Sequence, residues 1–301
     1  MREIVLIAKL SSKKGPEAFA EVTRALTARG ISIVEAHEVE TRKELRKRVK
    51  RAVKSGHKFI AVAGGDGSQA AAVDVMAHTK SVLAVIPAGT GNSFAQSLGM
   101  EPSIEAAIDT ILNGEVKRID LGRVNGTHFA NFATIGLSAE IGLDTPKLLK
   151  KITGGIAYGL SAVVPVLRKK PFKATIAWER NELKVDTFQM IVASGRYFGN
   201  TPILPDAGVT SGRLAFFTTA GTSRLDVMRM YLAFLNGTQT ELPDAHYFQT
   251  EKLTVKTKGK QLIAIDGSAF GYTPATFTIE CKALRVLMPA AAAQTEAEAG
   301  S

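Results

Sequence analysis

Over the first part of the chain, short apolar runs alternate with segments in which apolar residues recur at helical spacing. The runs predict strands, at 1–8, 31–39, 58–63 and 81–86. The segments between them predict helices: one begins at Pro16 and ends at Gly30, and a capping box of Thr41 and Glu44 begins the next. This alternation predicts an α/β domain, with an open, mostly parallel sheet and helices on both faces.

The pattern changes after residue 117. Asn125-Gly126 lies between two strand-like runs and is a strong hairpin signal. Further strands are predicted at 173–179, 184–193, 213–218, 252–256, 261–266 and 275–280, several of which alternate polar and apolar residues. Helical stretches at 145–168 and 222–236 interrupt them. The second half is therefore predicted to be a mainly antiparallel β domain, similar to a β-sandwich.

These changes divide the chain into an α/β domain at 1–120, a mainly β domain at 121–289 and a tail at 290–301. The tail is rich in alanine and glutamate and predicts disorder. No apolar run reaches the length of about 18 residues that a spanning helix needs, and the N-terminal run is too short for a signal peptide. Because the only cysteine, Cys281, excludes an internal disulfide, we expect a cytoplasmic protein.

The most informative motif is the glycine turn Gly64-Gly65-Asp66-Gly67-Ser68, between an apolar run and an alanine-rich segment. Glycines let a ligand approach the backbone, and amides at the start of a helix favour an anion such as phosphate. The carboxylate of Asp66 is unexpected beside phosphate. It binds a metal ion that bridges phosphate oxygens, accepts a proton from an attacking hydroxyl, or caps the helix in an Asx-type turn.

A second glycine loop, Gly89-Thr90-Gly91-Asn92, follows the next apolar run. Both loops are expected at the carboxyl ends of parallel strands, where such sheets bind ligands. Neither loop fits the P-loop or dinucleotide patterns, so the pair predicts a nucleotide site of another design. The residues predicted to bind the nucleotide are Gly64, Gly65, Gly67, Ser68, Gly89, Thr90, Gly91 and Asn92.

Taken in this order, the two loops resemble the catalytic domain shared by diacylglycerol kinases, sphingosine and ceramide kinases, and YegS-like bacterial lipid kinases. The similarity continues over most of the chain, through 120–126, 129–132 and 136–140 to Ile265-Asp266-Gly267 and 274–277. The first motif alone also occurs in NAD kinases and phosphofructokinases. The combination is what makes the resemblance specific.

The resemblance implies transfer of the γ-phosphoryl group of ATP to a lipid hydroxyl, with Mg²⁺ neutralising charge. It implies catalytic roles for Asp66, which is also the candidate Mg²⁺ ligand, and for Asp266. In the sphingosine-kinase branch the base matches Asp66, and in the bacterial diacylglycerol-kinase branch it matches Asp266. The sequence leaves open which of the two is the base here. Glu140 matches an acidic position that contacts the lipid headgroup in the sphingosine branch.

The chain departs from the family pattern at several positions. The N-terminal Asn-Pro motif is replaced near 9–12, and serines stand at three positions where the family often has acids: Ser93, Ser211 and Ser268. A hydroxyl is a poorer ligand for a hard cation than a carboxylate is. The structural Mg²⁺ site that Ser211 would join is therefore not expected, and altered substrate choice or weak activity becomes an alternative.

The net charge of +10 is clustered, at 42–54, 147–151 and 168–173. Such clusters suit anionic lipid headgroups or the steering of ATP. A solvated helix face is the alternative for the segment 42–54. Because no nucleic-acid-binding motif is present, we expect an anionic membrane surface as the partner, with peripheral association, and no nucleic acid. The five histidines lack metal-ligand spacing and are predicted to be ordinary surface or loop residues.

The leading prediction is an ATP-dependent lipid kinase whose substrate is diacylglycerol, a sphingoid base, ceramide or a similar lipid alcohol. One alternative is a kinase of a soluble alcohol with the same loops. Another is a catalytically weak protein that binds lipid or nucleotide. The sequence carries no signal for the lipid or for the oligomeric state.

Overall fold

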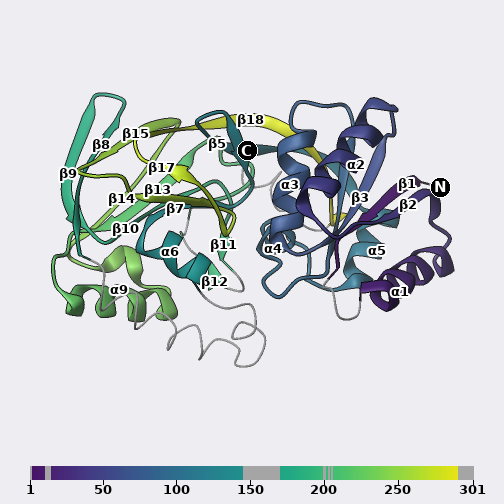
Figure 1. The fold of residues 1–301 in the computed structure, drawn as a ribbon, viewed down its shortest axis with the longest axis horizontal. Helices are drawn as coiled ribbons and strands as arrows, with labels where there is room; N and C mark the ends of the chain where they lie inside the picture. The colour runs from purple at the N-terminus through teal and green to yellow at the C-terminus, as the bar shows by residue number, and fades with distance from the viewer. Residues whose placement is uncertain are drawn as a thin grey trace.

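The computed structural model describes residues 2–10, 15–144, 170–198, 201–202, 204 and 206–290. An α/β half and a mainly β half lie next to each other along the long axis (Figure 1). The helix predicted at 145–168, the basic group at 147–151, Arg168, Lys169 and the tail at 291–301 lie outside the described residues. The predicted α/β and antiparallel β classes are both confirmed.

The α/β half is built on four parallel strands in the order β2-β1-β3-β4. Strands β3 and β4 are buried along their whole length, as their continuous apolar runs require. Helices α2 and α3 pack together, as do α1 and α5, on opposite faces of the sheet (Figure 1). The elements are β1 (Glu3–Ala8), α1 (Gly15–Ala28), β2 (Ser32–Glu38), α2 (Arg42–Lys54), β3 (Phe59–Gly64), α3 (Asp66–Met76), β4 (Val82–Pro87), α4 (Ser93–Ser97) and α5 (Ile104–Asn113).

The mainly β half contains two facing sheets with an apolar core between them, which includes Phe129, Phe216 and Phe277. One sheet has the order β14-β13-β10-β7-β16-β17. It is formed by β7 (Phe132–Gly136), β10 (Gln189–Ala193), β13 (Leu214–Thr219), β14 (Ala245–Thr250), β16 (Leu262–Ile265) and β17 (Ser268–Tyr272). The other is formed by β5 (Glu115–Val124), β6 (Thr127–Phe129), β8 (Phe172–Trp178), β9 (Asn181–Thr187), β15 (Lys252–Thr257) and β18 (Ala275–Met288).

Four shorter elements and one longer helix complete the described part of this half. They are α6 (Leu137–Asp144), β11 (Tyr197–Phe198), β12 (Thr201–Pro202), α9 (Arg224–Asn236) and a 3₁₀ turn at Gln239–Glu241. Helix α9 confirms the helix predicted at 222–236, whereas α6, β14 and β17 were not predicted. The single strand predicted at 184–193 is wrong. The chain leaves one sheet at Thr187 and enters the other at Gln189, because Phe188 turns into a second apolar core.

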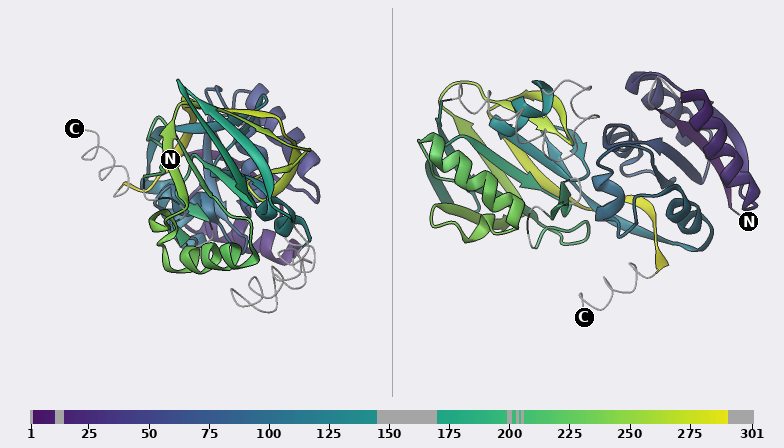
Figure 2. Two further views of the ribbon diagram at one scale, coloured as in Figure 1. Left: turned by 90° about the vertical axis from the view of Figure 1, so that its left-hand side faces the viewer. Right: turned by 90° about the horizontal axis from the view of Figure 1, so that it is seen from below.

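Strand β18 joins the two halves. Its first part pairs with β15, and β5 pairs with it on both sides of a bulge. On its other edge, Val286 pairs in parallel with Leu83 of β4. A single ten-stranded sheet therefore runs through the molecule, with β18 as the yellow ribbon in Figures 1 and 2. Leu284, Val286 and Leu287 lie in the core of the α/β half. The proposed division at residue 120 falls inside β5, and the chain returns to the α/β half at its end.

Candidate functional site

The two glycine loops meet backbone to backbone at the carboxyl ends of β3 and β4. A Cβ atom built on Gly89 would lie 2.4 Å from the Cα atom of Gly65. The amide of Ala88 donates to the carbonyl of Gly64 at 3.1 Å. A side chain at Gly89 would collide with the other loop, and a Cβ atom on Gly65 would lie 3.1 Å from the Cα atom of Gly89, so the contact depends on glycine above all at position 89. The backbones of the two predicted loops therefore contact each other directly.

Asp66 fastens one loop to the other. It is the first residue of α3, and its Oδ1 accepts the N–H of Phe94 at the start of α4, at 3.0 Å. Burial raises the pKa of Asp66, while hydrogen bonds from the amides of Phe94 and Ser93 act to lower it. Its carboxylate therefore caps the start of the neighbouring helix α4. No described side chain caps α3 at Gly65, and the amides of Ser68 and Gln69 donate to the Gly65 carbonyl, so the Gly67 amide is the one left to an anion.

Asn92 maintains the shape of the second loop. It adopts the left-handed conformation, with φ of 50°. Its Oδ1 accepts the Gly89 amide at 2.9 Å, and its Nδ2 donates to the Gly89 carbonyl at 3.0 Å. Thr90 is exposed at the tip, whereas Ser68 is buried against Gly64. Of the three polar residues predicted to bind the nucleotide, Ser68 and Asn92 are buried and Thr90 is the most accessible.

Gln69 supports the loops from inside the protein, and the sequence analysis missed it. Its side chain is only 2% exposed. Its side-chain amide nitrogen, Nε2, donates to the carbonyl of Val62 at 2.8 Å and lies 3.4 and 3.5 Å from the carbonyls of Gly64 and Ile86. Gln69 therefore ties together the ends of β3 and β4. The available signal was a polar residue within an alanine-rich helix.

Asp266 lies in the turn between β16 and β17, with φ of 44° and 6% exposure. Its carboxylate accepts three backbone amides: Ala130 at 2.8 Å, Asn131 at 2.9 Å and Phe132 at 3.2 Å. Burial raises its pKa to about 6, against the opposing effect of these amides, and the negative charge of Asp66 raises it further. The two candidate carboxylates therefore lie close enough to interact electrostatically.

Arg42 connects the two segments that carry these carboxylates. Its Nη1 donates to the hydroxyl of Ser268 at 2.5 Å, and a Cβ atom on Gly67 would lie 2.5 Å from its Nη2. The basic segment 42–54 was predicted to be a membrane-facing or solvated surface. For Arg42 this is corrected, because the first residue of α2 points at the glycine turn, which its position in the charge run could not reveal.

Two further residues lie beside the segments that hold Asp266. Ser97, at the end of α4, donates to Oδ1 of Asn131 at 2.9 Å and so links the second glycine loop to the segment that holds Asp266. Glu140 is half-buried on α6, which packs against β7, β16 and β17 around Asp266. The structure thus places the predicted headgroup residue on the element beside the buried carboxylate.

The segment with Ser211 is closed by its own hydrogen bonds. The Ser211 hydroxyl donates to the Arg213 carbonyl at 2.9 Å. The nearby Asp120 carboxylate accepts the amides of Gly212 at 2.8 Å and Lys282 at 2.7 Å. Ser211 supplies no second acid beside Asp120, and a hydroxyl is a poor ligand for a hard cation. The residues present therefore do not favour a structural Mg²⁺ site here.

The histidine prediction needs correction. His37 and His57 flank Glu35, at 2.9 and 3.3 Å. His78 and His128 meet at a different carboxylate, and His128 is a half-buried strand residue. These residues are distant in sequence, so their spacing along the chain could not show the groups that the tertiary structure forms.

Paired glycine loops on a parallel sheet, with a carboxylate brought to them by a β-sandwich, define a two-domain kinase. The profile described as the diacylglycerol kinase catalytic domain matches residues 3–124. The profile described as the YegS C-terminal NAD kinase beta sandwich-like domain matches residues 133–288. The chain therefore belongs to the diacylglycerol kinase and YegS-like family of lipid kinases.

Relatives with a curated description are similar over most of their length. A diacylglycerol kinase of Bacillus subtilis is 28% identical over 77% of this chain and 78% of its own. A probable lipid kinase, YegS-like, of Shewanella frigidimarina is 26% identical over 76% of each chain. A solved structure of a diacylglycerol kinase from Bacillus anthracis covers 97% of this chain and 98% of its own, with a TM-score of 0.74 at 20% identity. Another structure from that organism reaches a TM-score of 0.83 at 22% identity, which supports the fold.

Proposed function

We propose that this chain is an ATP-dependent kinase that phosphorylates the hydroxyl group of a lipid alcohol. The observation that carries the proposal is the junction at Arg42, which contacts both the Asp66 glycine turn and the turn after Asp266. A phosphoryl donor on the first turn and an acceptor hydroxyl beside the second would then lie next to each other. Phosphoryl transfer depends mainly on such positioning and on neutralisation of charge.

The Gly67 amide at the start of α3 is the proposed contact of the ATP phosphates, with Thr90 and the loop backbone around Gly89 and Gly91 beside it. Asp66 is the proposed Mg²⁺ ligand. Its donor atoms are carboxylate oxygens, which suit this hard cation. The bound ion would neutralise phosphate charge, and Arg42 would add a fixed positive charge at the same turn.

Asp266 is the proposed proton acceptor for the substrate hydroxyl. Its pKa of about 6 lies near neutrality, where a general base is effective. Its two oxygens offer about four acceptor positions, and three backbone amides use three of them. One position remains for the hydroxyl. Glu140, on the neighbouring helix, is the proposed contact for the polar part of the lipid.

The proposed lipid substrate is diacylglycerol, a sphingoid base, ceramide or a similar alcohol. The names of the bacterial relatives favour diacylglycerol. The serine at position 268, where the family usually has glutamate, keeps a kinase of a soluble alcohol and a weakly active binding protein as alternatives. The Arg42 contact argues for a working site, because Ser268 takes part in the junction between the two turns.

The experiment is a phosphorylation assay with the full chain and radiolabelled ATP. Mixed micelles would carry diacylglycerol, sphingosine, ceramide or monoacylglycerol one at a time, with glycerol as a soluble alcohol, in Mg²⁺ or in EDTA. The expected result is a labelled lipid that requires Mg²⁺. Labelled glycerol without labelled lipid would support the soluble-alcohol alternative. ATP binding without transfer to any acceptor would support the weakly active protein.

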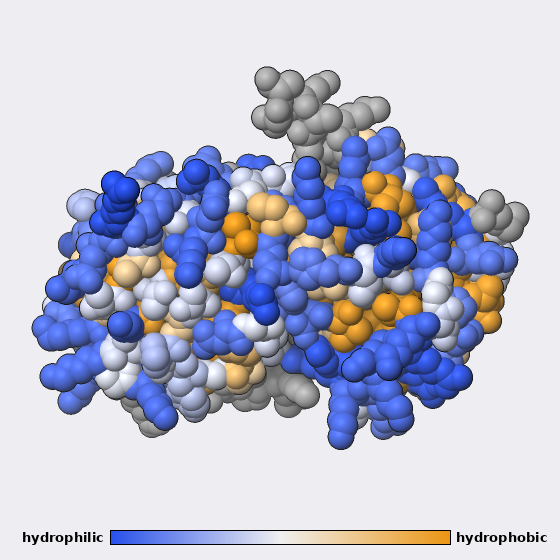
Figure 3. All heavy atoms as spheres, turned by 90° about the horizontal axis from the view of Figure 1, so that it is seen from above, coloured by the Kyte–Doolittle hydropathy of each residue, from blue (hydrophilic) through white to orange (hydrophobic). Residues whose placement is uncertain are grey.

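We also propose that the protein reaches its substrate by peripheral association with anionic membranes. Within the described residues, no helix is long and apolar enough to span a membrane. Hydrophilic side chains stand out around the α/β half, with apolar patches between them (Figure 3). On α2, the basic residues that face solvent are Lys43, Lys47, Lys50, Arg51 and Lys54.

Each basic residue near an anionic surface contributes about 1 kcal/mol, and salt weakens this attraction. Sedimentation with vesicles tests the proposal. Binding to anionic vesicles, weak binding to neutral ones and release at high salt are expected. Charge reversal at Lys47, Lys50 and Lys54 should reduce binding, and unchanged sedimentation would remove α2 from the docking surface.

A further inference from the structure

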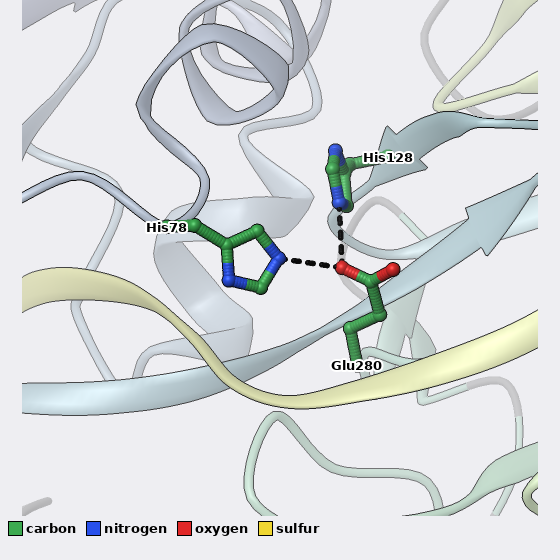
Figure 4. A group of neighbouring side chains, drawn as sticks. All are labelled: His78, His128 and Glu280. Atoms are coloured by element: carbon green, nitrogen blue, oxygen red, sulfur yellow. Dashed lines mark hydrogen bonds and ion pairs between the residues drawn. The ribbon is translucent and has the colours of Figure 1, made fainter.

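Three side chains from different parts of the chain meet at the junction of the two halves (Figure 4). His78 follows the end of α3, His128 lies on β6, and Glu280 lies on β18. The Nε2 atoms of His78 and His128 lie 2.6 and 2.9 Å from Oε2 of Glu280. All three atoms lie within 4.8 Å of one another. The group lies beyond the far end of α3 from Asp66, about 16 Å away for a helix of this length.

Two imidazole nitrogens and one carboxylate oxygen are ligands that Zn²⁺ prefers. In a tetrahedral site with bonds near 2.0 to 2.1 Å, ligand atoms lie about 3.3 Å apart. The observed separations from Glu280 are shorter by about half an ångström, so the side chains would have to open slightly. His78 can follow this movement because its side chain is 58% exposed.

Neighbouring groups orient the ligands. Nδ1 of His128 lies 3.3 Å from Oδ1 of Asp74, which also accepts the His128 backbone amide at 3.1 Å. Arg46 pairs with the other oxygen of Asp74, at 2.7 Å. A carboxylate on the outer nitrogen of a metal-binding histidine is the usual supporting contact, because it directs the lone pair of the other nitrogen to the metal.

The carboxylate of Glu280 is also oriented by a neighbouring side chain. Arg123 donates to Oε1 of Glu280 at 2.7 Å, which leaves Oε2 to the two imidazoles. With Asp74 at Nδ1 and Glu280 at Nε2, His128 has a carboxylate oxygen beside each ring nitrogen. A cation between Nε2 and Glu280, either a proton or a metal ion, is therefore favoured.

Protons on the two imidazoles satisfy these contacts pair by pair, whereas one divalent cation satisfies all three atoms together. We propose that His78, His128 and Glu280 form a Zn²⁺ site that fastens helix α3 to strands β6 and β18, with water as the fourth ligand. The site joins the α/β half to the β half behind the glycine loops. It differs from the Mg²⁺ position at Asp66 in place and in ligand chemistry, since nitrogen donors favour Zn²⁺ over Mg²⁺.

The chain contains a matched control. His37 and His57 also pair with one glutamate, Glu35, but they contact its two different oxygens. This second group is not among the described groups whose ligand atoms converge on one point. His37→Ala therefore removes a histidine from a similar pair without touching the proposed site.

The test is a Zn²⁺ titration of the full chain after metal removal with EDTA, against a chromogenic chelator. One Zn²⁺ per chain is expected, with micromolar or tighter affinity. His78→Ala and Glu280→Gln should each weaken binding by at least about tenfold, while His37→Ala should leave it unchanged. His78 is exposed but has a φ of 60°, where alanine is strained, so thermal unfolding of His78→Ala is measured beside its Zn²⁺ affinity.

Co²⁺ provides a direct readout of the ligands. The wild type should show the visible absorption of a low-coordinate Co²⁺ site, and His78→Ala should lose it. Three outcomes would overturn the proposal: no binding by the wild type, equal affinity in His78→Ala and the wild type, or an equal loss in His37→Ala. The three residues would then be a proton-bridged network only.

Discussion

Asp66 combines a structural contact with a proposed chemical role in one side chain. Its carboxylate joins the first glycine turn to the start of α4 through the Phe94 amide. The same carboxylate is the proposed Mg²⁺ ligand. The two roles can be separated by substitution, because an amide keeps the acceptor oxygen and removes only the charge.

Asp66→Asn should lower the rate of phosphoryl transfer by at least ~10²-fold, with thermal unfolding close to that of the wild type. Asp66→Ala should lose the same activity and, in addition, about 1 kcal/mol of stability, because the start of α4 loses its capping acceptor. Initial rates and urea denaturation measure the two effects. Asp109→Asn, on the exposed face of α5, is the control. Turnover of Asp66→Asn within a few-fold of the wild type would contradict the assignment.

Asp266 should make stability depend on pH. Its pKa is about 6 in the folded chain, against 3.8 for an unperturbed group. The folded state therefore binds the proton more tightly than the unfolded state does. The stabilisation that protonation of Asp266 gives the folded state is fully present below about pH 3.8. It is lost as the pH rises through 6, and the total loss is roughly 3 kcal/mol.

The measurement compares the wild type with Asp266→Asn by urea denaturation between pH 4 and pH 8, in EDTA and without nucleotide. As the pH rises, the wild type should lose stability relative to the variant, because only the wild type ionises a buried carboxyl group. A constant difference across this range would show that Asp266 has an ordinary pKa.

At the scale of elements, α2 shows that one run of basic residues has several environments. Leu45, Val49 and Ala52 are buried against the sheet. Arg42 contacts the glycine turn and Arg46 pairs with Asp74, whereas Lys43 faces solvent. Because the capping box at Thr41 determines where the helix begins, it also determines that Arg42, and not its neighbour, is directed at the site.

Arg42→Ala should therefore raise the apparent KM for ATP and lower the transfer rate, by about tenfold together, which corresponds to loss of one charge-assisted contact. Lys43→Ala, one residue further on, should leave both parameters unchanged. Steady-state kinetics over a range of ATP concentrations distinguish them. Equal effects of the two substitutions would mean that α2 acts only through its overall charge.

At the scale of the whole molecule, β18 makes the two halves interdependent. It leaves the β-sandwich, passes a bulge between Glu280 and Leu284 where Lys282 has a φ of 53°, and enters the α/β core. Leu284 is fully buried there. The α/β half therefore obtains part of its core from the end of the chain.

Leu284→Ala should lower the free energy of unfolding by about 2 to 5 kcal/mol, the usual cost of a buried leucine. Val116→Ala, on the neighbouring strand β5 and 43% exposed, should change stability by less than about 0.5 kcal/mol. A small effect of Leu284→Ala would indicate that the α/β half folds without β18.

Much of the architecture could be predicted because its causes are local. Apolar runs identified β3 and β4, and the turn residues Asn125-Gly126 identified a hairpin. The capping box at Thr41 was also predicted and is observed. Local signals failed where partners decided the outcome. The break at Phe188 depends on a second core, and β18 continues past residue 280 because its last residues fill the α/β half.

The sequence by itself determined the two glycine loops, the fold class of each half and the family, because motifs and periodicity are properties of neighbouring residues. Only the tertiary structure decided which distant groups meet: Arg42 with Ser268, Asp66 with Phe94, and His78 and His128 with Glu280. Side-chain chemistry at these points depends on burial and on the orientation of partners. Both arise only when the chain folds, and spacing along the chain does not encode either.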